Sequence, residues 1–476
     1  MPEDVEHRFE EILEIARTNE LDLDMINKAF QKAKQLHQGQ KRKDGAPYIS
    51  HPVEVALILA KLNFDENVVA AALLHDTIED CSYTPEQMKN EFNETVFNLV
   101  DCVSAIDKTK YVFDEENIYE DVDFVKSSVE EQTFKKLIKL GKENPCGFAI
   151  KFADRLHNLS TISIFEYPKQ LEKVRETEKW VLPIAKALKS GYFYKQIKNE
   201  CFKIVNNIKL KDFFEDYLDY HKCNERNINK ILLELKAQFT NTDVKSIEIE
   251  DIDECCIYES LLKKNRKINS KISKGHIIQF SNYNIFFIYK EGMFKNLIGE
   301  VINKLNIYKN LKIIECDKDS LFDKMFFTAV DKLKNKYDIY LLTEKEYLLS
   351  KVGTLDGQNL EKIDEDNIND LERDLIRVKT RSGEVKYIAK DSTVLDFAFK
   401  IHKDIGLTFK YAIVNGSKTK LPPYTKLNED DRVEIITDKK TNGEPIINAK
   451  LKWLAYVNTE LAKKVLIKYF EKYLND

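Results

Sequence analysis

A ten-residue run, Ala71-Ala-Leu-Leu-His75-Asp76-Thr-Ile-Glu79-Asp80, places four ionisable groups within six residues, directly after an apolar segment. At about 100° per residue, a helix through this run aligns His75 with Glu79. It also aligns Asp76 with Asp80. Crowding such groups beside a buried segment is costly unless a cation or a substrate compensates their charge. The run therefore predicts a metal site.

Two further fragments supply partners for the His-Asp doublet. A Gly- and Pro-punctuated loop leads through His51 into an expected helix at 53–62, and an apolar run ends in polar groups around Asp154. Two imidazoles and two carboxylates suit a borderline divalent ion such as Mn²⁺, Fe²⁺ or Zn²⁺, and not a cysteine-based structural zinc. We therefore predict that the metal ligands are His51, His75, Asp76 and Asp154. The nearby His37 and His157 are interpreted as core histidines and not as ligands.

The residues around this cluster predict a reaction class. A bound divalent ion lowers the pKa of its water and polarises a phosphoryl oxygen. Glu79 or Asp80 is expected to accept the proton of that water. Arg42 can grip a phosphate through two hydrogen bonds, and Lys43 adds a point charge. The parts predict metal-assisted hydrolysis of a phosphate ester in a nucleotide.

Four motifs in order resemble the hydrolase domain of RelA/SpoT homologues. They are His37-Gln-Gly-Gln-Lys-Arg42, Pro47-Tyr-Ile-Ser-His51-Pro52, the run at 71–80, and Lys151-Phe-Ala-Asp-Arg-Leu-His-Asn158. The resemblance covers roughly residues 20–195 and implies an HD-superfamily enzyme that removes the 3′-pyrophosphate from the alarmones ppGpp and pppGpp.

The resemblance also implies roles for single residues. It makes the four predicted ligands a Mn²⁺ site, with Glu79 and Asp80 orienting the attacking water. The residues implied to hold the nucleotide are Arg42, Lys43 and Asn158. The chain departs from the family at Asp44, usually Ser or Thr, and at Ser160, usually Arg, which leaves the substrate preference open.

Composition bounds the remaining possibilities. At 476 residues the chain is expected to hold about three domains. A charged fraction of 33% with a net charge of −5 argues against a basic nucleic-acid binder. No apolar run approaches the roughly 20 residues of a membrane span. Scattered cysteines without a CxxC pair favour reduced thiols in a cytoplasm.

Hydrophobic spacing divides the chain into four predicted parts, which make it a multidomain protein. Residues 1–195 show three-to-four-residue apolar spacing, which predicts an all-α HD hydrolase domain. Residues 196–370 are expected to continue helical to 239 and then to form an α/β domain, with a helix at 320–333 and a strand at 338–342. Residues 371–438 predict a ββαββ order typical of a small β-grasp domain. Residues 439–476 predict a C-terminal helical segment.

The α/β segment differs from the alarmone synthetase domain that long RelA/SpoT homologues carry at this place. The synthetase needs a Gly-rich, basic loop and a Glu-x-Gln-x-Arg-Thr strand followed by Met-His. The nearest match is Asp338-Ile-Tyr340-Leu-Leu342, followed by Tyr347. Tyr and Leu cannot supply the charge and hydrogen bonds of pyrophosphoryl transfer. We interpret the segment as a degenerate synthetase, and an unrelated α/β insert remains the alternative.

The run Thr393-Val-Leu-Asp-Phe-Ala-Phe-Lys-Ile-His402-Lys-Asp-Ile-Gly406 resembles the TGS domain. In long family members this domain senses the 3′ end of uncharged tRNA on the ribosome. The resemblance implies an RNA contact at His402. The residue alone fits the end of a helix almost equally well, where it would favour the helix dipole.

The sequence thus predicts a cytoplasmic, Mn²⁺-dependent guanosine 3′,5′-bispyrophosphate 3′-pyrophosphohydrolase without synthetase activity. Two alternatives remain. One is an HD hydrolase of another phosphorylated nucleotide, such as an adenosine alarmone or NADPH. The other is a non-catalytic alarmone sensor that binds tRNA or the ribosome.

Overall fold

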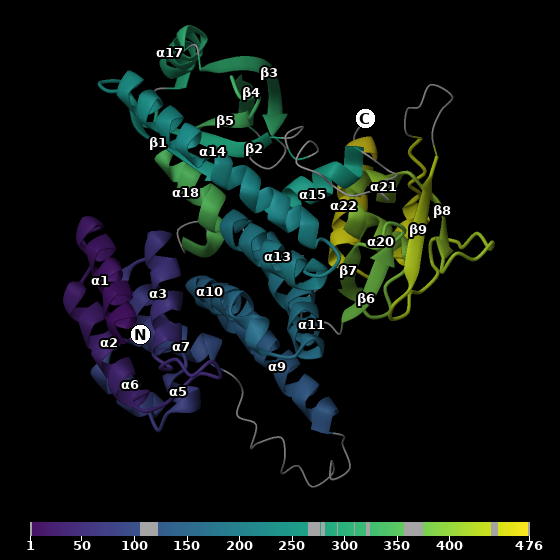
Figure 1. The fold of residues 1–476 in the computed structure, drawn as a ribbon. Coiled ribbons are helices and arrows are strands. Elements are labelled where there is room, and N and C mark those ends of the chain that lie inside the picture. The colour runs from purple at the N-terminus through teal and green to yellow at the C-terminus, as the bar shows by residue number, and fades with distance from the viewer. Residues whose placement is uncertain are drawn as a thin grey trace. The chain divides into compact units, whose positions relative to one another are not determined.

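The computed structural model describes residues 2–104, 122–264, 277, 281–292, 294–308, 310–319, 324–356, 375–438 and 446–474 (Figure 1). Contacts divide the chain into two compact units. The first unit holds Met1–Val100, Ala149–Val174 and Lys189–Gln358, and the second holds Asp101–Phe148, Arg175–Leu188 and Asn359–Asp476. Within the described ranges, no helix is both long enough and apolar enough to cross a membrane.

The N-terminal region is helical, as predicted. Its elements are α1 (Pro2–Thr18), α2 (Leu23–Leu36), α3 (Ser50–Lys61), α4 (Glu66–Leu74), α5 (Thr77–Asp80), α6 (Pro85–Glu91), α7 (Glu94–Val103), α9 (Val122–Glu143), α10 (Cys146–Ser160), η1 (Ile162–Ile164), α11 (Tyr167–Glu176), η2 (Thr177–Val181) and α12 (Leu182–Ala187). The helix expected to continue to residue 239 is interrupted, and forms α13 (Gly191–Asn206) and α14 (Lys211–Gln238).

Helix α4 is the centre of the helical core. Asp65 caps its N-terminus by accepting a hydrogen bond from the Val68 backbone, and every residue from Val68 to Leu74 is buried. A helix that is apolar all round has to be covered on every side, and α2 and α3 pack against it. The end of α4 therefore delivers the following polar residues, beginning with His75, into a buried setting.

A five-stranded mixed sheet forms the central α/β region. Its elements are β1 (Val244–Asp251), α15 (Glu254–Lys264), β2 (Ser281–Tyr289), α17 (Phe294–Ile307), β3 (Leu311–Asp319), β4 (Lys324–Asp331), β5 (Lys336–Thr343), α18 (Glu344–Val352) and η3 (Gly353–Asp356). The strand order is β1-β2-β5-β4-β3, in which only the β2–β5 pair is parallel.

Both faces of this sheet are apolar, because alternate residues of a strand point to opposite sides. Ile285, Phe287 and Ile339 face a large core that α14, α15 and α17 complete. Phe286 and Tyr340 belong to a smaller cluster on the other face, against which Tyr347 of α18 packs.

The prediction of a helix at 320–333 is wrong. Residues Lys324–Asp331 form strand β4, which pairs with β3 on one side and with β5 on the other. Pairing along both edges outweighs the local apolar spacing, which does not distinguish a short buried strand from a helix. The apolar run at 276–280 also predicts a strand, but of these residues the structure describes only Ile277, which is helical.

The second sheet confirms the predicted β-grasp order. It consists of β6 (Leu375–Thr380), β7 (Val385–Ala389), β8 (Phe409–Val414) and β9 (Arg432–Thr437), with α20 (Val394–Ile401) and α21 (Lys403–Leu407) between the two hairpin halves. The strand order is β7-β6-β9-β8, and the central β6–β9 pair is parallel. Gly383 adopts a φ of 92° in the β6–β7 turn, a left-handed conformation that favours glycine.

A buried carboxylate attaches the C-terminal segment to this domain. The segment contains η5 (Leu451–Ala455) and α22 (Glu460–Leu474). Asp396 is 1% exposed and accepts hydrogen bonds from the backbone N–H groups of Asn458 and Thr459, and from the Thr459 hydroxyl. It also accepts from the Thr393 backbone and hydroxyl. Asp396 therefore joins the start of α20 to the start of α22.

We expect Asp396→Asn to lower the free energy of unfolding of this unit by about 3 kcal/mol, because an amide nitrogen would face buried donors. Urea unfolding followed by tryptophan fluorescence measures this, since Trp180 and Trp453 are the two tryptophans of the chain and both lie in this unit. The control is Asp438→Asn, which removes an exposed ion pair with Lys410 and should change little. Equal effects of the two substitutions would contradict the role given to Asp396.

Candidate active site

Three elements of the first unit bring the predicted ligands together. His51 lies in the first turn of α3, His75 follows the last residue of α4, and Asp154 lies on α10. One ligand atom from each of these side chains lies within 4.8 Å of the others, and all three residues are buried. Asp76 adjoins them, with its Oδ1 at 3.1 Å from the Nε2 of His75 and its Oδ2 at 3.7 Å from the Nε2 of His51.

The helix is interrupted where the sequence suggested a continuous helix. Helix α4 ends at Leu74 and the short helix α5 begins at Thr77. The Thr77 hydroxyl donates to the Leu74 carbonyl at 2.6 Å, which satisfies a carbonyl that the helix end would leave without a partner. The break leaves His75 buried and Asp76 half-buried at the edge of the core.

Hydrogen bonds fix the tautomers of both imidazoles. The Nδ1 of His75 donates to the Ala72 carbonyl at 2.8 Å, so its Nε2 carries the lone pair. The Nδ1 of His157 lies 3.5 Å from the Arg42 guanidinium, which can only donate, and 2.7 Å from the Nδ1 of His51. His157 therefore accepts, His51 donates from Nδ1, and the Nε2 of His51 also carries a lone pair.

These residues fit a divalent metal ion. The Nε2 of His75 is buried and makes no hydrogen bond among the described residues, which is costly for a polar atom that water cannot reach. The Nε2 of His51 lies 3.2 Å from Asp154. Two imidazole nitrogens with lone pairs and neighbouring carboxylate oxygens form the mixed donor set that borderline divalent ions prefer.

Charge around Asp154 keeps its carboxylate ionised. Burial alone would raise the pKa of Asp154, but the ammonium group of Lys151 holds it well below its ordinary range. Burial likewise opposes the charge of Lys151, whereas Asp154 and Glu79 raise the pKa of this lysine above its ordinary value. Lys151 and Asp154 thus keep opposite charges and form an ion pair in the site.

Tyr48 connects the cluster to the predicted catalytic pair. Its hydroxyl lies 2.9 Å from Asp76 Oδ2 and 2.7 Å from Asp80 Oδ2. One hydroxyl proton serves only one of these carboxylates at a time, so the other keeps a free acceptor. Both Glu79 and Asp80 are exposed on α5.

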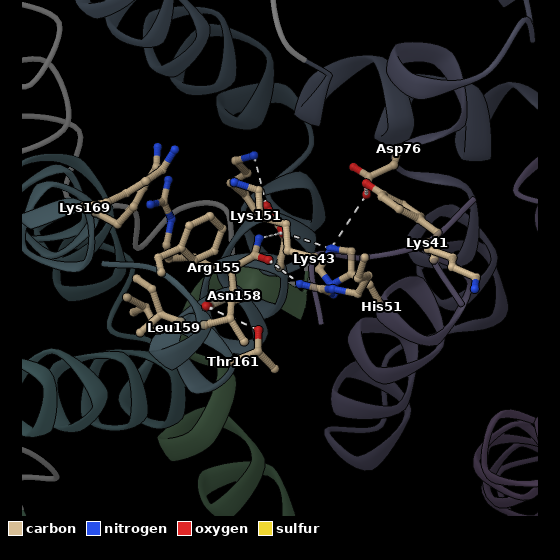
Figure 2. Close-up of a pocket in the computed structure, with 17 residues that line it drawn as sticks. Lys41, Lys43, His51, Asp76, Lys151, Arg155, Asn158, Leu159, Thr161 and Lys169 are labelled. Atoms are coloured by element: carbon tan, nitrogen blue, oxygen red, sulfur yellow. Dashed lines mark hydrogen bonds and ion pairs between the residues drawn. The ribbon is translucent and has the colours of Figure 1, made fainter. Parts of the chain in front are cut away.

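A cavity of about 450 Å³ opens from the cluster (Figure 2). The predicted nucleotide-binding residues Arg42, Lys43 and Asn158 line it, together with Tyr48, His51, Asp76 and Asp154. Arg42 and Lys43 lie on a loop that is closed by the Arg42 N–H bonding to the Ala46 carbonyl at 2.8 Å. Glu79 and Asp80 are not among the described residues that line the cavity.

Sequence reasoning missed several residues of this site. His157 is half-buried rather than in the core, and it bonds to a predicted metal ligand. His37 is buried, as interpreted, and stacks on the Tyr48 ring with centroids 4.6 Å apart. Phe165 and Lys169 also line the cavity, and a single aromatic and a single lysine on a polar segment gave no signal.

The two departures from the family pattern lie outside the cavity lining. Asp44 accepts a hydrogen bond from the Ala46 backbone at 2.9 Å and shapes the loop. The Ser160 hydroxyl donates to the His157 carbonyl at 2.9 Å. Both side chains are exposed.

His402 lies in the second unit, between α20 and α21. Its backbone N–H bonds to the Ala398 carbonyl, and its Nδ1 accepts from the Asp404 backbone at 3.2 Å. The side chain thus caps the start of α21 and remains 58% exposed.

Two family models match parts of the chain. A family model described as an HD domain matches residues 29–188, and one described as a TGS domain matches residues 376–437. Relatives named "Guanosine-3′,5′-bis(diphosphate) 3′-pyrophosphohydrolase" occur in Aquifex aeolicus, at 27% identity over 94% of this chain, and in Haemophilus influenzae, at 26% identity over 92%. The chain therefore carries an HD domain and a TGS domain.

Other relatives carry a different name. A "Probable GTP pyrophosphokinase" of Mycobacterium leprae is 26% identical over 95% of this chain. The chain spans 64%, 66% and 59% of the Aquifex, Haemophilus and Mycobacterium proteins, respectively. A solved structure described as "A metazoan ortholog of SpoT hydrolyzes ppGpp and plays a role in starvation responses" matches 39% of this chain and 96% of that chain, at 21% identity and a TM-score of 0.30.

We expect His157→Ala to lower the affinity for Mn²⁺ by about 10- to 100-fold, because it removes the acceptor that orients the His51 ring. Titration calorimetry with Mn²⁺ measures this without reference to activity. His157→Asn, which offers an acceptor oxygen, should recover part of the loss. His7→Ala, at an exposed histidine of α1, is the control. An unchanged affinity in His157→Ala would exclude the orienting role.

Proposed function

We propose that this protein hydrolyses the 3′-pyrophosphate of ppGpp and pppGpp, giving GDP or GTP and pyrophosphate, with Mn²⁺ as the metal. One observation carries the proposal. One cavity is lined both by His51 and Asp154 of the candidate metal cluster and by the cationic side chains of Arg42 and Lys43. The names of the Aquifex and Haemophilus relatives support the same substrate.

The proposed metal ligands are His51, His75, Asp76 and Asp154. When bound there, a divalent ion would supply Lewis acidity toward a phosphoryl oxygen and acidify its water. The Ala72 carbonyl and His157 hold His75 and His51, respectively, in the tautomer that leaves a lone pair on Nε2. It also supplies negative charge from Asp154, whose ionised form is stabilised by Lys151 at 3.1 Å.

The proposed catalytic residues are Glu79 and Asp80, which would orient the attacking water and accept its proton. Tyr48 supports this role, since its hydroxyl contacts Asp80 and fixes it next to Asp76. The proposed substrate-binding residues are Arg42, Lys43 and Asn158. A bidentate guanidinium and an ammonium beside the cluster match the charge of a diphosphate.

The structure does not support the sequence argument for an HD hydrolase that acts on another phosphorylated nucleotide. It rested on Asp44 and Ser160, and both make local hydrogen bonds to backbone outside the cavity lining. A sensor without catalysis is the weaker alternative, because a binding site alone has little need of the Asp76–Tyr48–Asp80 arrangement. RNA contact at His402 stays a prediction, and the exposed ring is compatible with it.

We expect the purified protein with Mn²⁺ to release GDP and pyrophosphate from ppGpp, and Asp76→Ala to abolish both Mn²⁺ binding and turnover. Glu79→Gln should keep Mn²⁺ binding but lower kcat by about 100- to 10,000-fold, the usual contribution of a general base. Product analysis by ion-exchange chromatography measures turnover, and Glu86→Gln, at an exposed acid of α6, is the matched control. Metal binding without turnover of ppGpp would refute the proposal and direct the assay to adenosine alarmones and NADPH.

We further propose that the central domain has no pyrophosphoryl transferase activity. Tyr340 and Leu342, which stand where a synthetase strand carries Gln and Arg, are 7% and 1% exposed. They pack with Phe286 and Ile288, so apolar side chains fill this face of the sheet. Tyr347, at the expected imidazole position, bonds to Glu250 at 2.9 Å.

Incubation of the full chain with ATP and GTP should therefore yield neither ppGpp nor pppGpp. The assay follows transfer of labelled phosphate from ATP in the Asp76→Ala background, where no hydrolysis would remove a product. Formation of a guanosine bispyrophosphate would show that the domain is active and that the filled face is not its substrate site.

A further inference from the structure

The first of the four sequence motifs, which begins His37-Gln-Gly-Gln40, contacts the candidate site without forming part of the cavity. Neither His37 nor Gln40 is among the described residues that line it. His37 follows the last residue of α2 and is 3% exposed, and Gln40 is half-buried in the loop that leads to Arg42. Any effect of this pair on the site therefore has to pass through the residues that it contacts.

The side-chain amide of Gln40 connects His37 to the end of α5. Its Nε2 donates to the Asp80 carbonyl at 3.2 Å, and its Oε1 lies 2.8 Å from the Nδ1 of His37. Because a carbonyl can only accept, the NH₂ group of the amide faces Asp80 and the amide oxygen faces the imidazole. The Nδ1 of His37 therefore donates to Gln40, and the two side chains form one connected unit.

Helix α5 depends on such contacts because it is one turn long. It consists of the four residues Thr77–Asp80, and an isolated helical turn is unstable in water. The last carbonyls of a helix have no partner within it, and Gln40 supplies a donor to one of them, that of Asp80. The next residue, Cys81, donates from its thiol to the Leu36 carbonyl at 3.5 Å. Both contacts attach the end of α5 to the end of α2 and the loop that follows it.

His37 packs against Tyr48, which is the second contact of Asp80. The two rings stack with centroids 4.6 Å apart and an interplanar angle of 21°. The Tyr48 hydroxyl lies 2.7 Å from Asp80 Oδ2 and 2.9 Å from Asp76 Oδ2. The Tyr48 backbone also donates to the Gln40 carbonyl at 3.0 Å. Asp80 is thus held at its backbone by Gln40 and at its carboxylate by the ring that His37 packs against.

We propose that Gln40 and His37 are positioning residues of the proposed hydrolase, which hold Glu79 and Asp80 in place relative to the metal ligands. The inference rests on the proposed function. Both residues act through Tyr48 and the Asp80 carbonyl, and neither touches the nucleotide or the metal ion. A displacement of about 1 Å at the reacting groups can lower a rate about 100-fold. The pair therefore affects the rate of the chemical step and not the binding of nucleotide or metal.

The test uses Gln40→Glu in the full chain with Mn²⁺ and ppGpp. One carboxylate oxygen of the variant still accepts from His37, whereas the other faces the Asp80 carbonyl in place of a donor. We expect kcat to fall about 10- to 100-fold, with KM for ppGpp and the affinity for Mn²⁺ unchanged. The matched control is Gln38→Glu, which adds the same charge at an exposed residue of the same motif and should leave kcat unchanged.

Two substitutions of His37 test the stacking contact separately. His37→Phe keeps an aromatic ring against Tyr48 and loses the hydrogen bond to Gln40, whereas His37→Ala loses both. The kcat of His37→Phe should therefore exceed that of His37→Ala about tenfold. Equal kcat values in the two variants would contradict the role given to the His37 ring.

An unchanged kcat in Gln40→Glu, or a loss of Mn²⁺ affinity as large as the loss of kcat, would overturn the positioning role. A wild-type protein that leaves ppGpp intact would instead refute the proposed function, and hydrogen exchange then decides the inference by itself. The backbone amides of α5 should exchange about tenfold faster in Gln40→Glu than in the wild type and in Gln38→Glu. Equal exchange rates in the three proteins would overturn the inference.

Discussion

The hydrogen bond between His51 and His157 joins two imidazoles that are 106 residues apart in the chain, at a distance of 2.7 Å. It connects the first turn of α3 to the last turns of α10, and it decides which nitrogen of His51 faces the cluster. Asp154 and Asn158 lie on the same helix as His157 and share this connection. Unless α10 lay alongside α3, His51 of α3 would not meet Asp154 of α10 in the candidate site.

Burial in the surrounding apolar core makes these polar side chains costly in folding free energy. Helix α4 is buried along most of its length, and His75 follows it with 4% exposure. Removing imidazoles and carboxylates from water disfavours folding unless each polar atom finds a partner. Most of these atoms have protein partners, while the Nε2 of His75 does not hydrogen-bond within the described residues. An incompletely hydrogen-bonded polar site inside an otherwise consistent core is typical of a functional site.

Much of the fold could be predicted from the sequence, because apolar spacing is strong in the helical region and the turn residues mark the β-grasp hairpin. The grouping of His51, His75 and Asp154 followed from motifs with distinctive spacing. Strand β4 was mistaken for a helix, since its apolar run is short and its pairing partners lie in β3 and β5. The four predicted domain ranges stay predictions, and the contact-based units cut across them.

Other features had no local signal. The interruption between α4 and α5, where the Thr77 hydroxyl bonds to the Leu74 carbonyl, is not revealed by a helical pattern alone. The role of His157 depends on His51, which is distant in the chain, so the local sequence did not distinguish His157 from other histidines near helix ends. Phe165 and Lys169 lie on a polar stretch, and only the contact of Phe165 with Lys43 shows that this stretch belongs to the cavity.

The position of Arg42 has a thermodynamic consequence. Its guanidinium contacts His157 and donates to Asn158 at 3.3 Å, and these two residues in turn contact His51 and Asp154. A phosphate that draws Arg42 away exchanges these contacts and alters the groups that hold the proposed ligands. Nucleotide and metal ion would then be linked ligands, each changing the affinity for the other by the same factor. The metal concentration needed for half-saturation would depend on how much nucleotide is present.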